Sequence, residues 1–191
     1  MKILTSLVAS LAGALVGCGG GGASSVVIQL DQYIGTWSGC ADAEKMIVTL
    51  EPASGNSLNL SLVAEYFENS DCSGPVAGAA SYSSPLAVLT YESTDSILIE
   101  DPISYPVELL GTHSVDIFDS TAQAGTVSLT GNVDVNNCIV GTGFCFDQLS
   151  YPQTRKRVAF NLANGVMTPI NFVNAAGDNW YADEITWQRT D

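Results

Sequence analysis

Basic residues are scarce in this chain of 191 residues. Six Lys and Arg residues stand against 20 Asp and Glu residues, which gives a formal net charge of −14 at pH 7. Nucleic acids are bound through clustered Lys and Arg that neutralise phosphates. Anionic lipid headgroups likewise attract basic segments and repel acidic ones. The composition therefore argues against nucleic acid as a partner and favours an acidic, well-solvated surface.

Catalytic motifs are also lacking. His113 is the only histidine, so a Ser-His-Asp triad would have to use it, and no Gly-x-Ser-x-Gly motif is present to expose a serine. A solvent-facing strand position explains His113 equally well. Carboxylate pairs that could cleave glycosides are expected by chance among so many acidic residues, and surface solvation is their simpler role. These pairs are Glu65 with Glu68, Glu100 with Asp101, and Asp183 with Glu184. We predict no catalytic residue, no enzymatic activity and no cofactor.

Signals for metal binding are weak. No Cys-x-x-Cys pair is present, which disfavours a structural zinc site. Calcium takes oxygen ligands from loops. The loop-edge groups that could supply them are 134–137, and Asp178 and Asn179 with Asp183. Neither group has the spacing of an EF-hand, and Asp and Asn favour turns in any case. We predict no metal site, with calcium at these loops as the alternative.

The longest apolar run, residues 3–16, is too short for a membrane-spanning helix, which needs about 20 residues. It follows Lys2 and ends in small residues, which is typical of a secretory signal peptide. The sequence Leu15-Val16-Gly17-Cys18 resembles the lipobox of bacterial lipoproteins. That resemblance implies cleavage before Cys18 and acylation of its thiol and its new amine. The alternative is an ordinary signal peptide that is removed whole.

Three segments follow from this interpretation. Residues 1–17 are the signal peptide, residues 18–25 are the lipidated cysteine with a glycine-rich tether, and residues 26–191 are a single domain. Acyl chains make anchoring stable, because each buried methylene contributes about 0.8 kcal/mol. By resemblance to lipoprotein sorting, Gly19 after the cysteine implies the outer membrane. We therefore expect a cell-envelope protein whose partner is a membrane, reached through the lipid anchor.

Four cysteines remain beyond the anchor, an even number that predicts two disulfides in an exported chain. Three connectivities are possible, and we favour Cys40–Cys72 with Cys138–Cys145. The second pair encloses a short loop with two glycines, Gly141 and Gly143, which let the backbone fold back.

Apolar and polar residues alternate along much of the chain, which predicts strands with one buried face. Residues 58–66 and 127–135 show the pattern most clearly, and Asn164-Gly165 predicts a tight hairpin. Strands are expected near 34–40, 44–51, 57–67, 76–82, 85–92, 96–101, 104–110, 113–119, 126–136, 144–151, 155–162, 166–173 and 180–188. The fold class is all-β, either an antiparallel up-and-down barrel or a β-sandwich.

The segment Tyr33-Ile34-Gly35-Thr36-Trp37 resembles the Gly-x-Trp opening of the lipocalins and the related avidins, barrels collectively called calycins. The resemblance implies that Gly35 and Trp37 close one barrel end and that Arg189, on the last expected strand, packs across the indole. Small exported bacterial lipoproteins with a Tyr-x-Gly-x-Trp start are also similar. Biotin is not expected. Biotin pockets are walled by several tryptophans, whereas this chain has only Trp37, Trp180 and Trp187, two of which are close together in the sequence.

Two functions are consistent with these features. The first is an anchored barrel that holds a small apolar molecule, in space left by small inward residues such as Gly78, Ala79, Ala80 and Gly131. The second is a structural or protein-interaction lipoprotein of the cell envelope with no small-molecule ligand. The triplet Arg155-Lys156-Arg157 bears on either function. Alternation sends its two arginines to one face and Lys156 to the other. An acidic partner or an anionic ligand could dock at the triplet, and pairing with a neighbouring acidic strand is the simpler role that we favour.

Overall fold

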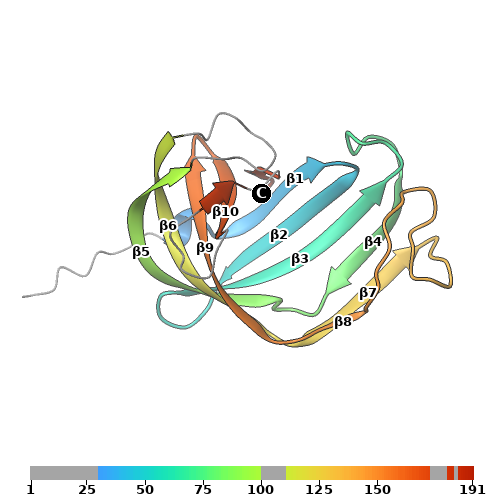
Figure 1. Ribbon diagram of the computed structural model, residues 1–191, viewed down its shortest axis with the longest axis horizontal. Coiled ribbons are helices and arrows are strands. Elements are labelled where there is room, and N and C mark those ends of the chain that lie inside the picture. Colours follow the sequence, from blue (N-terminus) through green and yellow to red (C-terminus); the bar gives the residue numbers. More distant parts are fainter. Residues whose placement is uncertain (1–29, 100–110, 173–179, 183–184) are drawn as a thin grey trace, which may run out of the picture.

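The computed structural model describes residues 30–99, 111–172, 180–182 and 185–191, which form an all-β fold with one short 3-10 helix (Figure 1). The helix, η1, spans Leu30–Gln32. The strands are β1 (Gly35–Ala41), β2 (Glu44–Pro52), β3 (Ser57–Phe67), β4 (Val76–Tyr82), β5 (Ala87–Ile99), β6 (Gly111–Ala122), β7 (Gly125–Gly131), β8 (Ser150–Tyr151), β9 (Thr154–Ala163), β10 (Val166–Phe172), β11 (Trp180–Ala182) and β12 (Trp187–Arg189).

Hydrogen bonds join these strands into one sheet, and eight of them close into a ring. The ring runs β1-β2-β3-β5-β6-β9-β10-β12 and returns to β1, with every neighbouring pair antiparallel. Strand β11 adds to β10 and also pairs with β5, which is the one parallel pairing among the described strands. The described strands therefore belong to one continuous sheet rather than to the two separate sheets of a sandwich.

Strand β3 is where the ring closes. Its first half, Ser57–Leu60, pairs with β5, whereas Val63–Phe67 pairs with β4. Beyond β4 the sheet continues through β7 to β8, so this extension lies outside the ring. Figure 1 shows β4, β7 and β8 flaring to the right while β5, β6 and β9 curve back on the left.

The alternation expected for residues 58–66 is confirmed, since Leu58, Ala64 and Tyr66 are all buried. The interpretation of 126–136 as one strand is wrong beyond Gly131, where β7 ends. Val135, expected to face inward, is 97% exposed. Similarly, the expected strand 144–151 is reduced to its last two residues, β8. Between β7 and β8 the backbone instead makes turns around a disulfide, and the expected strand 104–110 lies outside the described residues.

The expected strands 85–92 and 96–101 form one long strand, β5, with a bulge between Tyr91 and Ser93. Tyr91 pairs with Phe118, and both side chains are buried inside the ring. After the bulge the apolar side chains of β5 lie on the other face, because an inserted residue shifts the period-two alternation. They pack there in a second cluster, whose members are Ile97, Ile99, Val115, Ile117, Ala159 and Ile170.

The hairpin predicted at Asn164-Gly165 is confirmed. Both residues have positive φ, 54° and 78°, and they join β9 to β10 with Ala163 opposite Val166. A two-residue turn with positive φ at both positions matches the right-handed twist of the flanking strands, and Asn-Gly adopts it readily.

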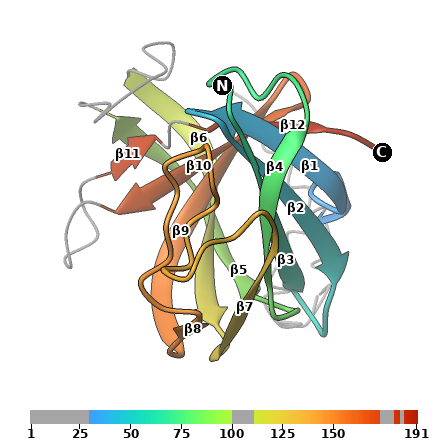
Figure 2. The same ribbon diagram turned by 90° about the vertical axis from the view of Figure 1, so that its right-hand side faces the viewer.

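The two disulfides have the favoured connectivity, Cys40–Cys72 and Cys138–Cys145. The first ties the end of β1 to the turn after β3 across 32 residues, and the second closes a seven-residue separation between β7 and β8. Figure 2, which looks onto the extension, shows the chain between β7 and β8 folded beside β4. Ile139, from inside that loop, is buried against Ala64 and Ala80.

Loop length predicts how much each disulfide stabilises the fold. Loop-closure entropy favours the longer bridge, at about 3–4 kcal/mol against about 2–3 kcal/mol for the shorter. In urea unfolding of the oxidised protein, the double variant Cys40→Ala/Cys72→Ala should lose more free energy of unfolding than Cys138→Ala/Cys145→Ala. A larger loss from the second pair would show that it supports more of the structure than its own loop.

Candidate functional site

One end of the ring is filled by aromatic side chains. Tyr33, Phe118 and Phe160 pack with their ring centroids 5.5–6.0 Å apart, and Tyr33 and Trp37 are each 1% exposed. The Trp37 indole donates a hydrogen bond of 2.8 Å to the Tyr33 carbonyl oxygen. These packed side chains, here called the plug, close this end of the ring.

The structure brings the expected end residues together. The Arg189 guanidinium carbon lies 4.8 Å from the centroid of the Trp37 ring, and its Nη2 donates to the Gln32 carbonyl oxygen at 2.7 Å. Gly35 has a φ of 131°, and a Cβ there would lie 2.7 Å from a carboxylate oxygen of Asp191. That carboxylate accepts a hydrogen bond of 2.9 Å from the Thr36 amide.

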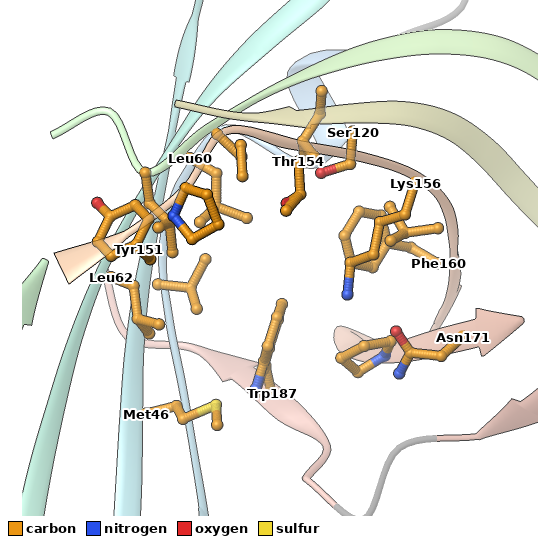
Figure 3. A pocket seen from close by; sticks show the side chains of 18 residues that line it. Met46, Leu60, Leu62, Ser120, Tyr151, Thr154, Lys156, Phe160, Asn171 and Trp187 are labelled. Atoms are coloured by element: carbon orange, nitrogen blue, oxygen red, sulfur yellow. The ribbon is translucent and has the colours of Figure 1, made fainter. Parts of the chain in front are cut away.

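Above the plug the ring encloses a cavity of about 410 Å³ (Figure 3). Thirteen of the 18 side chains that line it are apolar, so its wall is mainly hydrocarbon. Figure 3 shows Met46 and Leu62 on one side and Phe160 across from them. Trp187 forms part of the wall, and its Nε1 is buried without a hydrogen-bond partner among the described residues.

Polarity changes along β9, which crosses the cavity from mouth to floor. Thr154 and Lys156 are exposed, Val158 is half-buried, and Phe160 is 4% exposed. All four line the cavity, because every second residue of a strand points to the same face. The cavity therefore has a polar, wet mouth and an apolar, dry floor.

The small residues expected to leave internal space do not line this cavity. Ala80 is buried against Ile139 in the extension, and a Cβ on Gly78 would lie 2.7 Å from the Ile139 side chain. Ala79 is half-buried on the opposite face, and Gly131 is exposed with a φ of 96°. That expectation was wrong because a segment far along the chain fills the space beside Gly78.

The expectation for the basic triplet is confirmed. Arg155 donates to Asp119 at 2.7–2.9 Å, and Arg157 to Glu92 at 2.8 Å, both outside the ring. The Arg155 guanidinium holds the pKa of the Asp119 carboxyl below its usual value. Lys156 faces the other way and lines the cavity. The sequence held one signal for this cavity: Thr154 and Lys156 are polar, although they occupy the same face of β9 as the apolar Val158 and Phe160.

A second hollow, of about 280 Å³, surrounds Asp116 at the plugged end. The Asp116 carboxylate accepts hydrogen bonds from Tyr33, Thr94 and Gln32, so its oxygens are already engaged. His113 is half-buried on β6, opposite Ile97. This arrangement explains Asp116 as the anchor of Tyr33 in the plug.

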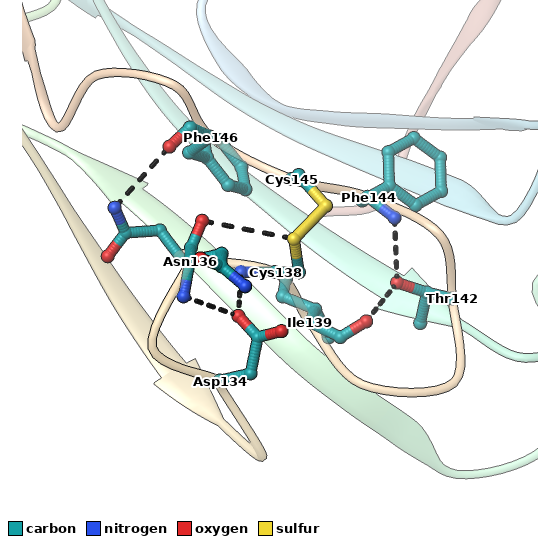
Figure 4. The surroundings of a disulfide bond; sticks show 9 residues. Asp134, Asn136, Cys138, Ile139, Thr142, Phe144, Cys145 and Phe146 are labelled. Atoms are coloured by element: carbon teal, nitrogen blue, oxygen red, sulfur yellow. Dashed lines mark hydrogen bonds between the residues drawn. A yellow bond between two sulfur atoms is a disulfide. The ribbon is translucent and has the colours of Figure 1, made fainter.

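The loop candidate for calcium at 134–137 serves another purpose. One oxygen of Asp134 accepts hydrogen bonds from the amides of Asn136 and Cys138, at 2.8 and 2.9 Å (Figure 4). These amides, that of Cys138 first, lower the pKa of the carboxyl, and they fix the turn beside the disulfide. No cluster of metal-ligating side chains occurs within the described ranges. The other candidate includes Asp178, Asn179 and Asp183, and it lies outside them.

Neither a protein-family model nor a curated protein nor a solved structure matches the chain. No helix of the described segments is long and apolar enough to cross a membrane.

The buried phenols predict sensitivity to alkali. Burial, then the hydrogen bond to Asp116, raises the pKa of Tyr33 well above its ordinary value of 10.0. Above about pH 10 the unfolded chain releases this proton while the folded protein keeps it, so the free energy of unfolding falls as pH rises. The slope from one such group approaches about 1.4 kcal/mol per pH unit. In urea unfolding between pH 8 and 11, Tyr33→Phe should show a shallower fall than the unmodified protein.

Tyrosinate absorbance provides the check on this assignment. Tyr33 should ionise only as the protein unfolds, and so should Tyr66, whose pKa is also raised by burial. The absorbance step at unfolding should therefore be smaller by one tyrosine in Tyr33→Phe. Ionisation of Tyr33 in the folded protein near the ordinary tyrosine pKa would contradict the prediction.

Proposed function

We propose that this protein is an exported lipoprotein whose ring of strands acts as a lipocalin-like barrel that binds a small, largely apolar molecule. The observation that carries the proposal is the cavity of about 410 Å³ with its mainly apolar wall. Ligand sites of small molecules typically measure about 300–1,000 Å³ and combine an apolar lining with a few polar groups.

The energetics of such a site favour apolar ligands. Each Å² of apolar surface that leaves water contributes about 25 cal/mol, so a molecule that covers the buried floor gains most of its affinity there. Leu89 and Phe160, 1% and 4% exposed, belong to that floor. Phe160 is itself part of the aromatic plug, and Leu89 belongs to the same buried cluster, so packing holds both side chains in place without a ligand.

The plugged end supports the lipocalin-like part of the proposal. Gly35, Trp37 and Arg189 meet where the resemblance places the closed end of a barrel. A guanidinium over an indole contributes about 0.5–1 kcal/mol at an exposed position. Closure at this end would leave the mouth beside Thr154 as the route for a ligand.

Export and anchoring rest on the sequence of residues 1–25 and on the cysteines. Two disulfides suit an oxidising compartment outside the cytoplasm. Acylation of Cys18 would hold the domain at a membrane surface, and Gly19 favours the outer membrane of the cell envelope. The ligand would then be captured from, or delivered to, the envelope.

A protein-interaction lipoprotein is the second candidate. Val135 and Val140, in the segment between β7 and β8 outside the ring, are 97% and 46% exposed. Apolar side chains on a protruding loop are suited to contact with another envelope protein. Under this candidate the cavity would bind no small molecule.

Blocking the cavity should weaken ligand binding. The protein for this test is the chain of residues 18–191 with Cys18→Ala, exported behind a fully removed leader so that it carries no acyl group. N-phenyl-1-naphthylamine, a neutral apolar fluorophore, should bind and alter the emission of Trp187. Ala122→Phe should weaken binding at least tenfold, about 1.4 kcal/mol, because Ala122 lines the cavity.

Thr121→Phe is the matched control, because its side chain points to the opposite face of β6. It should bind the fluorophore as tightly as the unblocked protein, with circular dichroism confirming the fold of both variants. Equal affinity in all three proteins would place the fluorophore elsewhere and reject the cavity as its site.

The anchor has its own prediction. In a bacterial host fed a labelled fatty acid, the unmodified protein should incorporate label and sediment with membranes, whereas Cys18→Ala should lose both properties. Ser24→Ala, in the tether, should keep them. A mature protein that mass spectrometry finds unacylated, or that begins elsewhere than residue 18, would contradict the lipobox interpretation.

A further inference from the structure

Three of the polar side chains that line the cavity, Ser120, Lys156 and Asn171, share one wall. Ser120 on β6 and Lys156 on β9 are direct cross-strand partners, and both line the cavity. Asn171, on β10, lies on the far side of β9 and lines it too. Figure 3 shows these three side chains on the same side, facing the apolar side chains of Met46, Leu60 and Leu62.

Lys156 differs from the basic residues on either side of it. Arg155 and Arg157 pair with carboxylates outside the ring, whereas Lys156 has no ion pair within the described part of the chain. Its ammonium group is directed into the cavity in Figure 3. The protein carries 20 acidic residues, yet the described ones leave this inward cation unpaired.

Ser120 is also without a partner. The residue is 6% exposed, and its hydroxyl makes no hydrogen bond with another described residue. The hydroxyl oxygen is not among the fully buried side-chain atoms that lack a partner, so it can be reached from the cavity. A hydroxyl can donate a hydrogen bond, so an acceptor atom of a ligand in the cavity is a fitting partner for it.

The position of these groups sets the orientation of a ligand. Lys156 lies near the mouth, and the inward residues below it on β9, Val158 and Phe160, are apolar. A molecule with a hydrocarbon tail on the floor would bring its head to the level of Lys156. A charge-assisted hydrogen bond there is stronger than a neutral one.

We infer that the ligand is an amphipathic anion, whose hydrocarbon tail fills the floor of the cavity and whose carboxylate or phosphate head is bound by Lys156 and the Ser120 hydroxyl. This inference rests on the proposed function, because it specifies the ligand of the same cavity. Ser120 donates its hydrogen bond to a head-group oxygen, and Lys156 supplies the charge.

Displacement of N-phenyl-1-naphthylamine tests the inference with ligands that share one tail. Dodecanoate and dodecyl phosphate, below their micellar concentrations, should displace the fluorophore at concentrations roughly tenfold lower than dodecanol or dodecylamine, which is about 1.4 kcal/mol. The stronger of the two anions identifies the head group, a fatty-acid carboxylate or a phosphate monoester of lipid type.

Variants of Lys156 assign the preference to this residue. Lys156→Met should remove the preference for the anion while dodecanol binds as before, and Lys156→Arg should keep it. Arg155→Met is the matched control on the outer face and should change neither. Fluorophore binding in every variant shows that the cavity remains intact.

The outcomes separate the two proposals. If the fluorophore binds and anion and alcohol displace it equally, the head-group inference is overturned and the apolar cavity stands. A preference for the anion that persists in Lys156→Met also overturns it. If the fluorophore does not bind the unblocked protein at all, the proposed function itself fails.

Discussion

The pairing of β3 with β5 is the constraint on which the rest of the structure depends. Four residue pairs, from Ser57 with Thr90 to Leu60 with Ala87, convert an open sheet into a ring. Hydrogen bonds between the Ser57 and Thr90 side chains, 3.0 Å, and from Asn56 to the Tyr91 carbonyl, 2.7 Å, support the junction. Closure removes two sheet edges and turns one apolar face into an interior.

The interior then divides by side-chain volume. Large aromatic side chains fill the end near Tyr33 and Trp37, whereas the other end carries residues such as Ala87 and Ala122 that leave space. The polar residues of the ring that line this space come from three neighbouring strands, β6, β9 and β10. The interior is therefore packed at one end, apolar in the middle and more polar at the mouth. Such an interior can distinguish the apolar end of a ligand from its polar end.

Much of the secondary structure could be predicted because strand periodicity is local. The boundaries of β3 and β4 and the Asn164-Gly165 hairpin were predicted correctly, and so were both disulfides. The errors fall where a specific interaction overrides the alternating pattern. Residues after Gly131 alternate like a strand, yet the Cys138–Cys145 bridge and the Asp134 turn hold them as a loop. The bulge between Tyr91 and Ser93 was not predicted either. It interrupts the alternation of β5, and this interruption was interpreted as a turn between two separate strands.

The sequence by itself determined which residues alternate, and hence that Lys156 points away from Arg155 and Arg157. It did not determine what Lys156 would face. That was decided by tertiary structure, since β2 and β3 meet β9 across the ring only after β3 pairs with β5. The same holds for Gly78, whose open side is filled by Ile139. The direction of a side chain depends on its own backbone, but the space in front of it depends on the volumes of residues that are distant in the chain.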